Sequence, residues 1–248
     1  MTGPETGMKR RTLLLFAHLC LFIQAGAVFS APESTPLASH PMTEGQLADR
    51  FHAYFQSQVA EAGVTGAAFA VATPDRIIRI GTAGYTDTSR GRPIDENTAF
   101  RIASVSKTFA AGLAGVLVDE GEFDWDDPVI DYVPNFRIDG DPGQVRIQHL
   151  LGQSTGLMPH AYDNLIEDGV PLEKIVEQYR KLSYICPPGQ CYSYQNSIFS
   201  LIEPVIEKTT ERSYADLMNN RIFKPLDMRN ASVGYEPFVA NPNRARPH

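Results

Sequence analysis

Ser104 and Lys107 form a Ser-x-x-Lys motif, a spacing that can hold a nucleophile beside its own base. On the first turn of a helix, positions i and i+3 share a face, so the lysine amine can reach the serine hydroxyl and, when neutral, accept its proton. The helix N-terminus also favours negative charge developing on a substrate oxygen. Because a chain of this length contains about one such match by chance, the motif alone does not distinguish this chemistry from a solvated serine and lysine.

Tyr194 and Asn196 supply a second polar pair, in the segment Tyr194-Gln195-Asn196. A tyrosine with a shifted pKa beside a lysine can carry the serine proton, and an asparagine two residues later can point the same way and hold a substrate amide. The segment follows a Pro-Gly turn and precedes the apolar run 198–202. This order and setting favour a single site built from both pairs.

The elements that must position these residues can be read from the hydrophobic pattern. Residues 44–61 have the periodicity of an amphipathic helix, and residues 66–72 and 76–81 are strand-like runs joined by a turn, which predicts a hairpin. A strongly apolar helix is predicted from Ser104 to about Glu120. The remaining sequence to about residue 230 is typical of helices interrupted by proline and glycine.

The stretch 84–157 resembles the superfamily of serine β-lactamases and penicillin-binding proteins, in its class C β-lactamase-like branch. The matching residues, including those beyond that stretch, are Gly84-Tyr85, Arg92-Pro93, Thr98, Phe100 to Phe109, Leu117 to Gly121, Asp126 to Val129, Tyr132, Pro134, His149 to Leu151, Gly156-Leu157, Pro188-Gly189 and Tyr194 to Asn196. The resemblance implies an α+β fold of the β-lactamase/DD-peptidase type. In that fold an antiparallel sheet with flanking helices meets a mostly helical subdomain.

The same resemblance implies a role for each polar residue. Ser104 would be the acylated nucleophile and Lys107 its proton partner, while Tyr194 would assist proton transfer to the leaving group and Asn196 would bind a substrate amide. The implied reaction is acyl transfer from a β-lactam, a D-Ala-D-Ala peptide or an ester, followed by hydrolysis, with no metal or organic cofactor. The alternative is an inactive or truncated family member that binds cell-wall peptides or β-lactams.

Two features depart from the family pattern. Gln153 stands where members usually carry histidine, in a loop where we expect the change to be tolerated. The third motif, Lys-Thr-Gly or His-x-Gly, should follow Tyr-x-Asn by well over a hundred residues, on a strand that lines the site, and this sequence ends 52 residues after Asn196. We therefore expect 44–248 to be an incomplete domain that lacks the C-terminal strands of the sheet, with a partial α/β part over 44–103 and a mostly helical part over 104–235.

The N-terminus has the pattern of an export signal. Positive residues after Met8 precede residues 12–29, which carry no formal charge and end among small residues. We expect a signal peptide over 1–31, a flexible linker rich in Pro, Ser and Thr over 32–43, and a mature protein in the periplasm or outside the cell. The alternative is an uncleaved membrane anchor, since this uncharged run of 18 residues is just long enough to span a membrane.

Cys186 and Cys191 are the only cysteines after the predicted signal peptide. In an oxidising compartment, two cysteines across a Pro-Gly turn can close a small disulfide loop. Two free thiols are the alternative. A metal site is a poorer interpretation, because no histidine or further cysteine lies nearby in the sequence to complete a coordination set.

Composition sets the broad class of partner. With 43% hydrophobic and 21% charged residues, the chain is typical of a globular protein with a real core. Its 22 basic and 29 acidic residues give a net charge of −7, and no basic run lies beyond the N-terminus. This charge disfavours nucleic acid as a partner. The family resemblance implies a small molecule or a peptide as the ligand, and we expect no stable membrane insertion unless the signal segment is retained.

Two further patterns have simpler explanations than chemistry. The segment Gly152 to Gly156 matches the Gly-x-Ser-x-Gly nucleophile elbow, but that elbow requires a preceding strand, and residues 145–151 are predicted to form a short helix. An acidic cluster lies at Asp124, Asp126, Asp127 and Asp131. It lacks the glycine and terminal glutamate of a calcium-binding loop, so we interpret it as a solvated turn.

Overall fold

The computed structural model describes residues 41–247. The predicted signal peptide and most of the predicted linker therefore lie outside the described residues. The helices and strands are α1 (Glu44–Glu61), β1 (Gly66–Ala72), β2 (Ile77–Gly84), α2 (Ser106–Asp119), α3 (Val129–Tyr132), α4 (Ile147–Leu151), α5 (Asp163–Glu167), α6 (Leu172–Val176), α7 (Asn196–Phe199), α8 (Ile202–Thr210), α9 (Tyr214–Leu217), a π-helix (Met218–Phe223) and α10 (Tyr235–Ala240).

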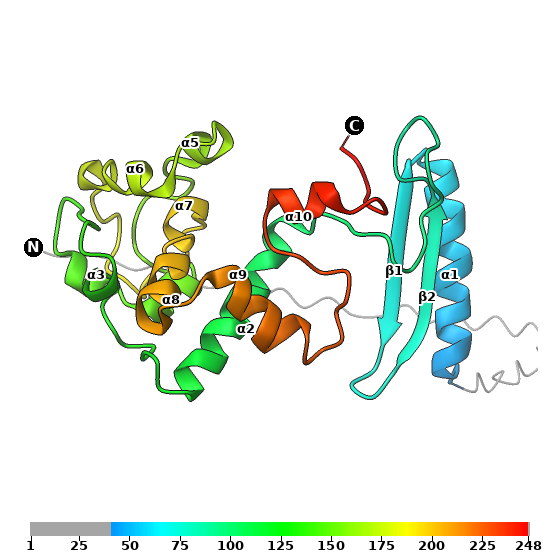
Figure 1. Ribbon diagram of the computed structural model, residues 1–248, viewed down its shortest axis with the longest axis horizontal. Coiled ribbons are helices and arrows are strands. Elements are labelled where there is room, and N and C mark those ends of the chain that lie inside the picture. Colours follow the sequence, from blue (N-terminus) through cyan, green and yellow to red (C-terminus); the bar gives the residue numbers. More distant parts are fainter. Residues whose placement is uncertain (1–40, 248) are drawn as a thin grey trace, which may run out of the picture. The chain divides into compact units, whose positions relative to one another are not determined.

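An antiparallel hairpin with one covering helix forms the first part of the described chain (Figure 1). Thr43 begins α1 with a reciprocal capping box to Gln46, which satisfies backbone groups that a helix start leaves free. Phe69 on β1 packs edge-on against Phe51 and Phe55 of α1, with ring centroids 4.8 Å apart in each pair. This aromatic cluster holds α1 against the hairpin.

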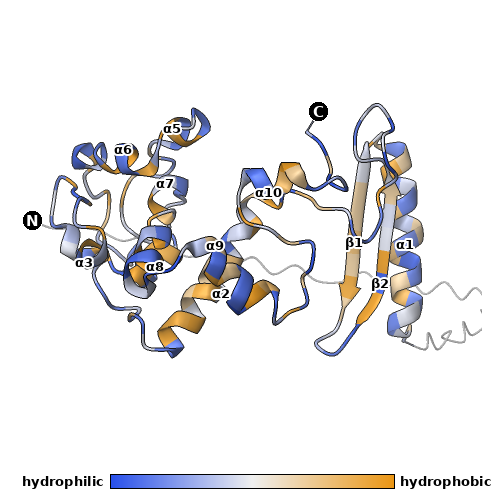
Figure 2. Ribbon diagram, viewed as in Figure 1, coloured by the Kyte–Doolittle hydropathy of each residue, from blue (hydrophilic) through white to orange (hydrophobic). Residues whose placement is uncertain are grey.

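Helix α2 is mostly hydrophobic (Figure 2) and contributes buried residues to the hydrophobic core. Its buried residues Ala110, Leu113, Ala114 and Leu117 recur at helical spacing, so one face of the helix is fully covered. Helix α8 and the π-helix contact it. Because α2 is packed in this way, the side chains on its first turn have a rigid base.

Residues near the end of the described chain pair with the segment that leads to Ser104. The backbone N–H of Ala99 donates to the carbonyl of Asn243 (2.9 Å), and the N–H of Ala245 donates to the carbonyl of Ala99 (2.9 Å). These bonds form a short parallel bridge between Ala99 and Arg244. The segment that precedes α2 is therefore held in place by residues near the C-terminal end of the described chain.

The acidic cluster closes a turn before α3. The carboxylate of Asp127 accepts hydrogen bonds from the backbone N–H of Asp124 (2.7 Å) and from the hydroxyl of Tyr132 (2.6 Å). Within residues 41–247, no group of three or more His, Cys, Asp or Glu side chains is arranged to hold a metal ion. Over the same residues, no helix combines the length and the apolar character that a membrane span requires.

Candidate active site

Ser104 lies at the entrance to α2, within a single 3₁₀ turn over Ala103–Val105. The helix predicted to start at Ser104 therefore starts two residues later as an α-helix. Ala103 has φ +45°, in the left-handed region that costs a non-glycine residue about 1–2 kcal/mol. Backbone strain of this kind is concentrated at functional sites. Here the strained residue directly precedes the predicted nucleophile.

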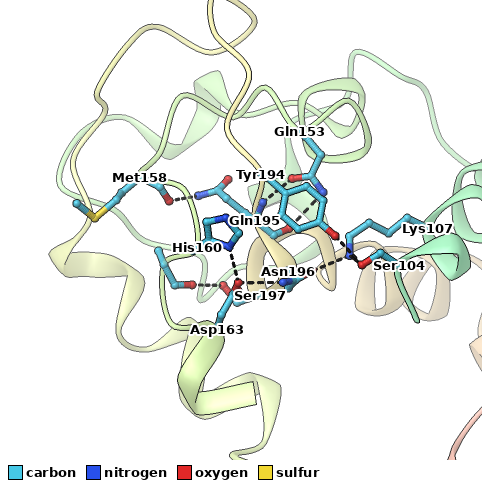
Figure 3. A network of polar contacts seen from close by, with 11 residues as sticks. Ser104, Lys107, Gln153, Met158, His160, Asp163, Tyr194, Gln195, Asn196 and Ser197 are labelled. Carbon is cyan, nitrogen blue, oxygen red and sulfur yellow. Dashed lines mark hydrogen bonds and ion pairs between the residues drawn. The ribbon is translucent and has the colours of Figure 1, made fainter. Parts of the chain in front are cut away.

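The four predicted residues come together around this turn (Figure 3). The Ser104 hydroxyl oxygen lies 2.6 Å from the Tyr194 hydroxyl and 3.4 Å from Lys107 Nζ. Lys107 Nζ also donates to Asn196 Oδ1 at 2.6 Å. Lys107 thus connects Ser104 to Asn196, the first residue of α7, and Ser104 contacts two groups that can take its proton.

The electrostatics of the site favour an ionisable tyrosine. Hydrogen bonds with Ser104 and with Lys107 lower the pKa of Tyr194 below its ordinary value, because they stabilise the phenolate. The Lys107 ammonium also lies 4.9 Å from the ring centroid of Tyr194 and 5.3 Å from that of Phe199. These contacts hold the amine in place by cation–π attraction as well as by hydrogen bonds.

Gln153 holds the strand-like segment that carries Tyr194. Its side-chain oxygen accepts from the backbone N–H of Gln195 (2.7 Å), and its side-chain nitrogen donates to the carbonyl of the same residue (3.3 Å). Its own carbonyl accepts from the N–H of Ser193 (2.7 Å). Tyr194 is therefore fixed on both sides by one buried glutamine, a role that the sequence interpretation of Gln153 as a tolerable loop change missed.

Replacing Gln153 by glutamate is expected to destabilise the protein by about 1–3 kcal/mol, the cost of leaving a buried acceptor unsatisfied. The new carboxylate has no N–H to donate, so the carbonyl of Gln195 would lose the hydrogen bond that it accepts from Gln153. Urea unfolding of the variant measures the loss. Gln190→Glu, at an exposed position of the neighbouring loop, is the matched control. Equal unfolding midpoints for both variants would contradict the role of Gln153.

A disulfide joins Cys186 and Cys191, whose Cα atoms are 6.4 Å apart, and closes the loop just before Tyr194. The backbone N–H of Gly189 inside this loop donates to the carbonyl of Ser154 (2.7 Å). The N–H of Ile185, at its start, donates to the carbonyl of Gly156 (2.8 Å). The loop is thus attached to the segment 152–157 and sets the direction in which the chain enters the site.

The structure confirms the expectation that residues 152–156 do not form a nucleophile elbow. The segment follows the helix α4, whereas a nucleophile elbow follows a strand. Instead of presenting a nucleophile, the segment supports the Tyr194 loop through the contacts of Gln153 and Gly156 described above. Its glycines and serine therefore have a structural explanation.

Two residues that the sequence analysis did not assign to the site complete its polar network (Figure 3). Asp163, the first residue of α5, accepts a hydrogen bond from Asn196 Nδ2 at 2.9 Å through Oδ2. The same oxygen lies 3.0 Å from His160 Nδ1. No local motif marks Asp163, because its contact with Asn196 joins residues 33 positions apart.

An apolar cavity of about 760 Å³ lies beside the start of α2. Ala103 and Val105 line it on either side of the nucleophile, and Phe109, Met218 and Phe223 contribute apolar side chains. Neither Lys107 nor Tyr194 lines it. Ser104 does not line it either, so the three side chains proposed to transfer the proton lie outside this cavity.

The fold and the site define the class of protein, and comparison with known proteins gives the family. The described architecture aligns with an octameric penicillin-binding protein homologue from Pyrococcus abyssi (TM-score 0.69, 24% identity, covering 79% of this chain and 47% of that one). It also aligns with a class C β-lactamase (TM-score 0.68, 22% identity, covering 83% and 56%). These alignments confirm the expected β-lactamase/DD-peptidase-like α+β fold, with its small antiparallel sheet.

The family model for β-lactamase matches residues 51–248, so the chain belongs to the β-lactamase family of serine hydrolases. Esterase EstB of Burkholderia gladioli is 33% identical over 208 residues, covering 77% of this chain and 53% of that protein. A β-lactamase of Yersinia enterocolitica is 27% identical over 193 residues (77% and 48%). A D-aminopeptidase of Gluconobacter oxydans is 28% identical over 205 residues (77% and 37%). The chain spans about half the length of these relatives or less.

Proposed function

We propose that Ser104 is an acylated nucleophile and that the protein is a serine hydrolase acting on a β-lactam, a D-Ala-D-Ala peptide or an ester. The observation that carries this proposal is the contact of the Ser104 hydroxyl with Tyr194 at 2.6 Å and with Lys107 at 3.4 Å. A hydroxyl held against two titratable groups can be deprotonated as it attacks. Relatives named as an esterase, a β-lactamase and a D-aminopeptidase support the range of acyl substrates.

The proposed reaction has two steps. Ser104 Oγ attacks the substrate carbonyl carbon, and its proton passes to the Tyr194 phenolate or to the neutral amine of Lys107. The bond from the carbonyl carbon to the leaving group then breaks, and that same proton passes to the leaving atom. In the second step water attacks the ester, one water proton returns to Ser104 Oγ through the same groups, and the acid is released.

The decisive experiment is covalent labelling. The chain is incubated with a fluorescent penicillin and with an activated ester, and its intact mass is followed over time. We expect an adduct on Ser104, absent in Ser104→Ala and retained in Ser106→Ala, a matched exposed serine two residues away. An adduct that decays indicates a hydrolase, and one that persists indicates the binding-protein alternative. A folded chain without any adduct would overturn the proposal.

The pH profile of acylation follows from the shifted pKa of Tyr194. Hydrogen bonds lower this pKa, and the phenolate is the form that accepts the Ser104 proton, so the rate should increase with pH and reach half its rise below the ordinary tyrosine value of about 10. Adduct formation measured from neutral to alkaline pH tests this. Tyr194→Phe should lose the rise, whereas Tyr192→Phe, at an exposed tyrosine, should keep it. A rise that survives in Tyr194→Phe would assign it to another group.

We also propose that the protein is exported to the periplasm or beyond. The charged start after Met8 and the uncharged run 12–29 support this, as does a disulfide between Cys186 and Cys191, since such bonds persist in oxidising compartments. Cell fractionation with mass measurement of the N-terminus tests the proposal. A mature chain that retains residues 1–31 in the cytosol would contradict it.

A further inference from the structure

Asp163 presents a carboxylate to the amide of Asn196, on the side opposite Lys107. Asn196 Nδ2 donates to Asp163 Oδ2 at 2.9 Å, while Asn196 Oδ1 accepts from Lys107 Nζ at 2.6 Å. The Asp163 side chain is only 18% exposed. Its second oxygen, Oδ1, is buried and accepts no hydrogen bond from any residue between 41 and 247. Burying a carboxylate this way carries a desolvation cost, which calls for a compensating role.

An asparagine amide has two ends of nearly equal shape and opposite hydrogen-bonding character. The carboxylate of Asp163 can only accept, so it selects the NH₂ end of Asn196. While Lys107 is an ammonium, it can only donate, so it selects the oxygen end of Asn196. Asp163 and Lys107 then favour the same orientation of the Asn196 amide. The situation changes when the lysine is neutral.

A neutral Lys107 has a lone pair and can accept as well as donate. If the Asn196 amide turned over, its N–H would donate into that lone pair and compete with the Ser104 proton. With its oxygen held toward Lys107, Asn196 accepts a hydrogen bond from one lysine N–H. The lysine lone pair then points away from Asn196. Lys107 Nζ lies 3.4 Å from Ser104 Oγ and also hydrogen bonds with Tyr194.

We propose that Asp163 is a positioning residue that keeps the Asn196 amide oxygen turned toward Lys107 while Lys107 takes the Ser104 proton. This inference rests on the proposed function. His160 also contacts this carboxylate, since its Nδ1 lies 3.0 Å from the same oxygen that Asn196 contacts. Tyr162, with φ +61°, turns the chain into α5 and so places Asp163 as its first residue.

The test is a double-mutant cycle on the full chain, with the unchanged protein, Asp163→Asn, Asn196→Asp and the double variant. The rate of Ser104 acylation is measured by intact mass at increasing concentrations of the fluorescent penicillin or activated ester. Asp163→Asn should slow acylation at saturating probe about tenfold, within the range of coupling between contacting side chains. The half-saturating probe concentration should stay unchanged, because the Asp163 carboxylate faces Asn196 and His160 and makes no contact with Ser104.

The second arm of the cycle distinguishes an effect of Asp163 on the orientation of the Asn196 amide from a general contribution of Asp163 to the stability of the site. A carboxylate at position 196 has no N–H to turn toward Lys107, so adding Asp163→Asn to Asn196→Asp should not slow acylation further. Asp168→Asn removes the same charge from the exposed end of α5 and should leave the rate of the unchanged protein as it is. If Asp163→Asn slows both backgrounds by the same factor, the proposal is overturned.

Urea unfolding of the same four chains keeps the inference separate from the proposed function. Asp163→Asn should lower the unfolding midpoint of the unchanged protein and raise that of Asn196→Asp, where two carboxylates otherwise face each other. If the unchanged protein forms no adduct on Ser104, the proposed function fails, and this reversal of sign still tests the orientation of Asn196. Shifts of the same sign in both backgrounds would contradict the inference.

Discussion

Replacing Lys107 by methionine is expected to slow acylation of Ser104 by about 10³-fold, within the range that general acid–base groups contribute. Methionine keeps the length and the apolar stem of the side chain but can neither donate nor accept a proton. Ser104 loses its 3.4 Å contact and Asn196 loses its 2.6 Å contact. The pKa of Tyr194 should rise as well, because Lys107 is one of the two groups whose hydrogen bonds lower it.

Intact-mass measurement of adduct formation against time gives the rate, and urea unfolding checks that the variant is folded. Lys208→Met, at an exposed lysine of α8, is the matched control and should acylate at the unchanged rate. If the Lys107 variant also reacts within a few-fold of the unchanged protein, Lys107 does not take part in the transfer of the Ser104 proton.

Replacing Gly156 by alanine is expected to destabilise the protein by about 3 kcal/mol, at the upper end of ordinary single substitutions. Gly156 has φ +77°, which disfavours any residue with a Cβ. An added Cβ would also lie 2.2 Å from the carbonyl oxygen of Cys186, so backbone must move. The segment that must shift leads into the disulfide loop and Tyr194, and we therefore expect slower acylation too.

Thermal or urea unfolding measures the stability change, and Gly112→Ala provides a control of opposite sign. Gly112 lies inside α2 with open space around its Cα. Alanine there should stabilise the protein by about 0.5–1 kcal/mol, since glycine weakens a helix interior. A Gly156 variant as stable as the unchanged protein would show that the Cys186 segment adapts at no cost.

The sequence predicts best those helices and strands whose formation depends on residues close together in the chain. The helix expected over 44–61 has those bounds in the structure, because hydrophobic periodicity and the Thr43 cap agree. The second strand, expected to end at Gly81, continues to Gly84, since its pairing with β1 extends to Gly66. An alanine with positive φ before Ser104 has no sequence signature, so the 3₁₀ turn at the start of α2 was not expected.

The part of the site that depends on residues close together in the sequence was also predicted. Ser104 and Lys107 are three residues apart on one turn, and their proximity follows from helix geometry. Their meeting with Tyr194 and Asn196 was expected from the family resemblance. The roles of Gln153 and Asp163 depend on contacts across 42 and 33 residues that belong to no motif. Only the folded arrangement of the loop 152–163 against the segment 193–197 reveals them.

The contact between Ser104 and Tyr194 closes a loop of 90 residues. For a flexible chain, bringing the ends of such a loop together costs at least about 4 kcal/mol of entropy. A hydrogen bond contributes about 1 kcal/mol net, so the bonds within the site cannot hold the loop closed. The buried core around α2 must do so. The constellation therefore exists only in molecules whose helical part is fully folded, and the extent of Ser104 labelling would count those molecules directly.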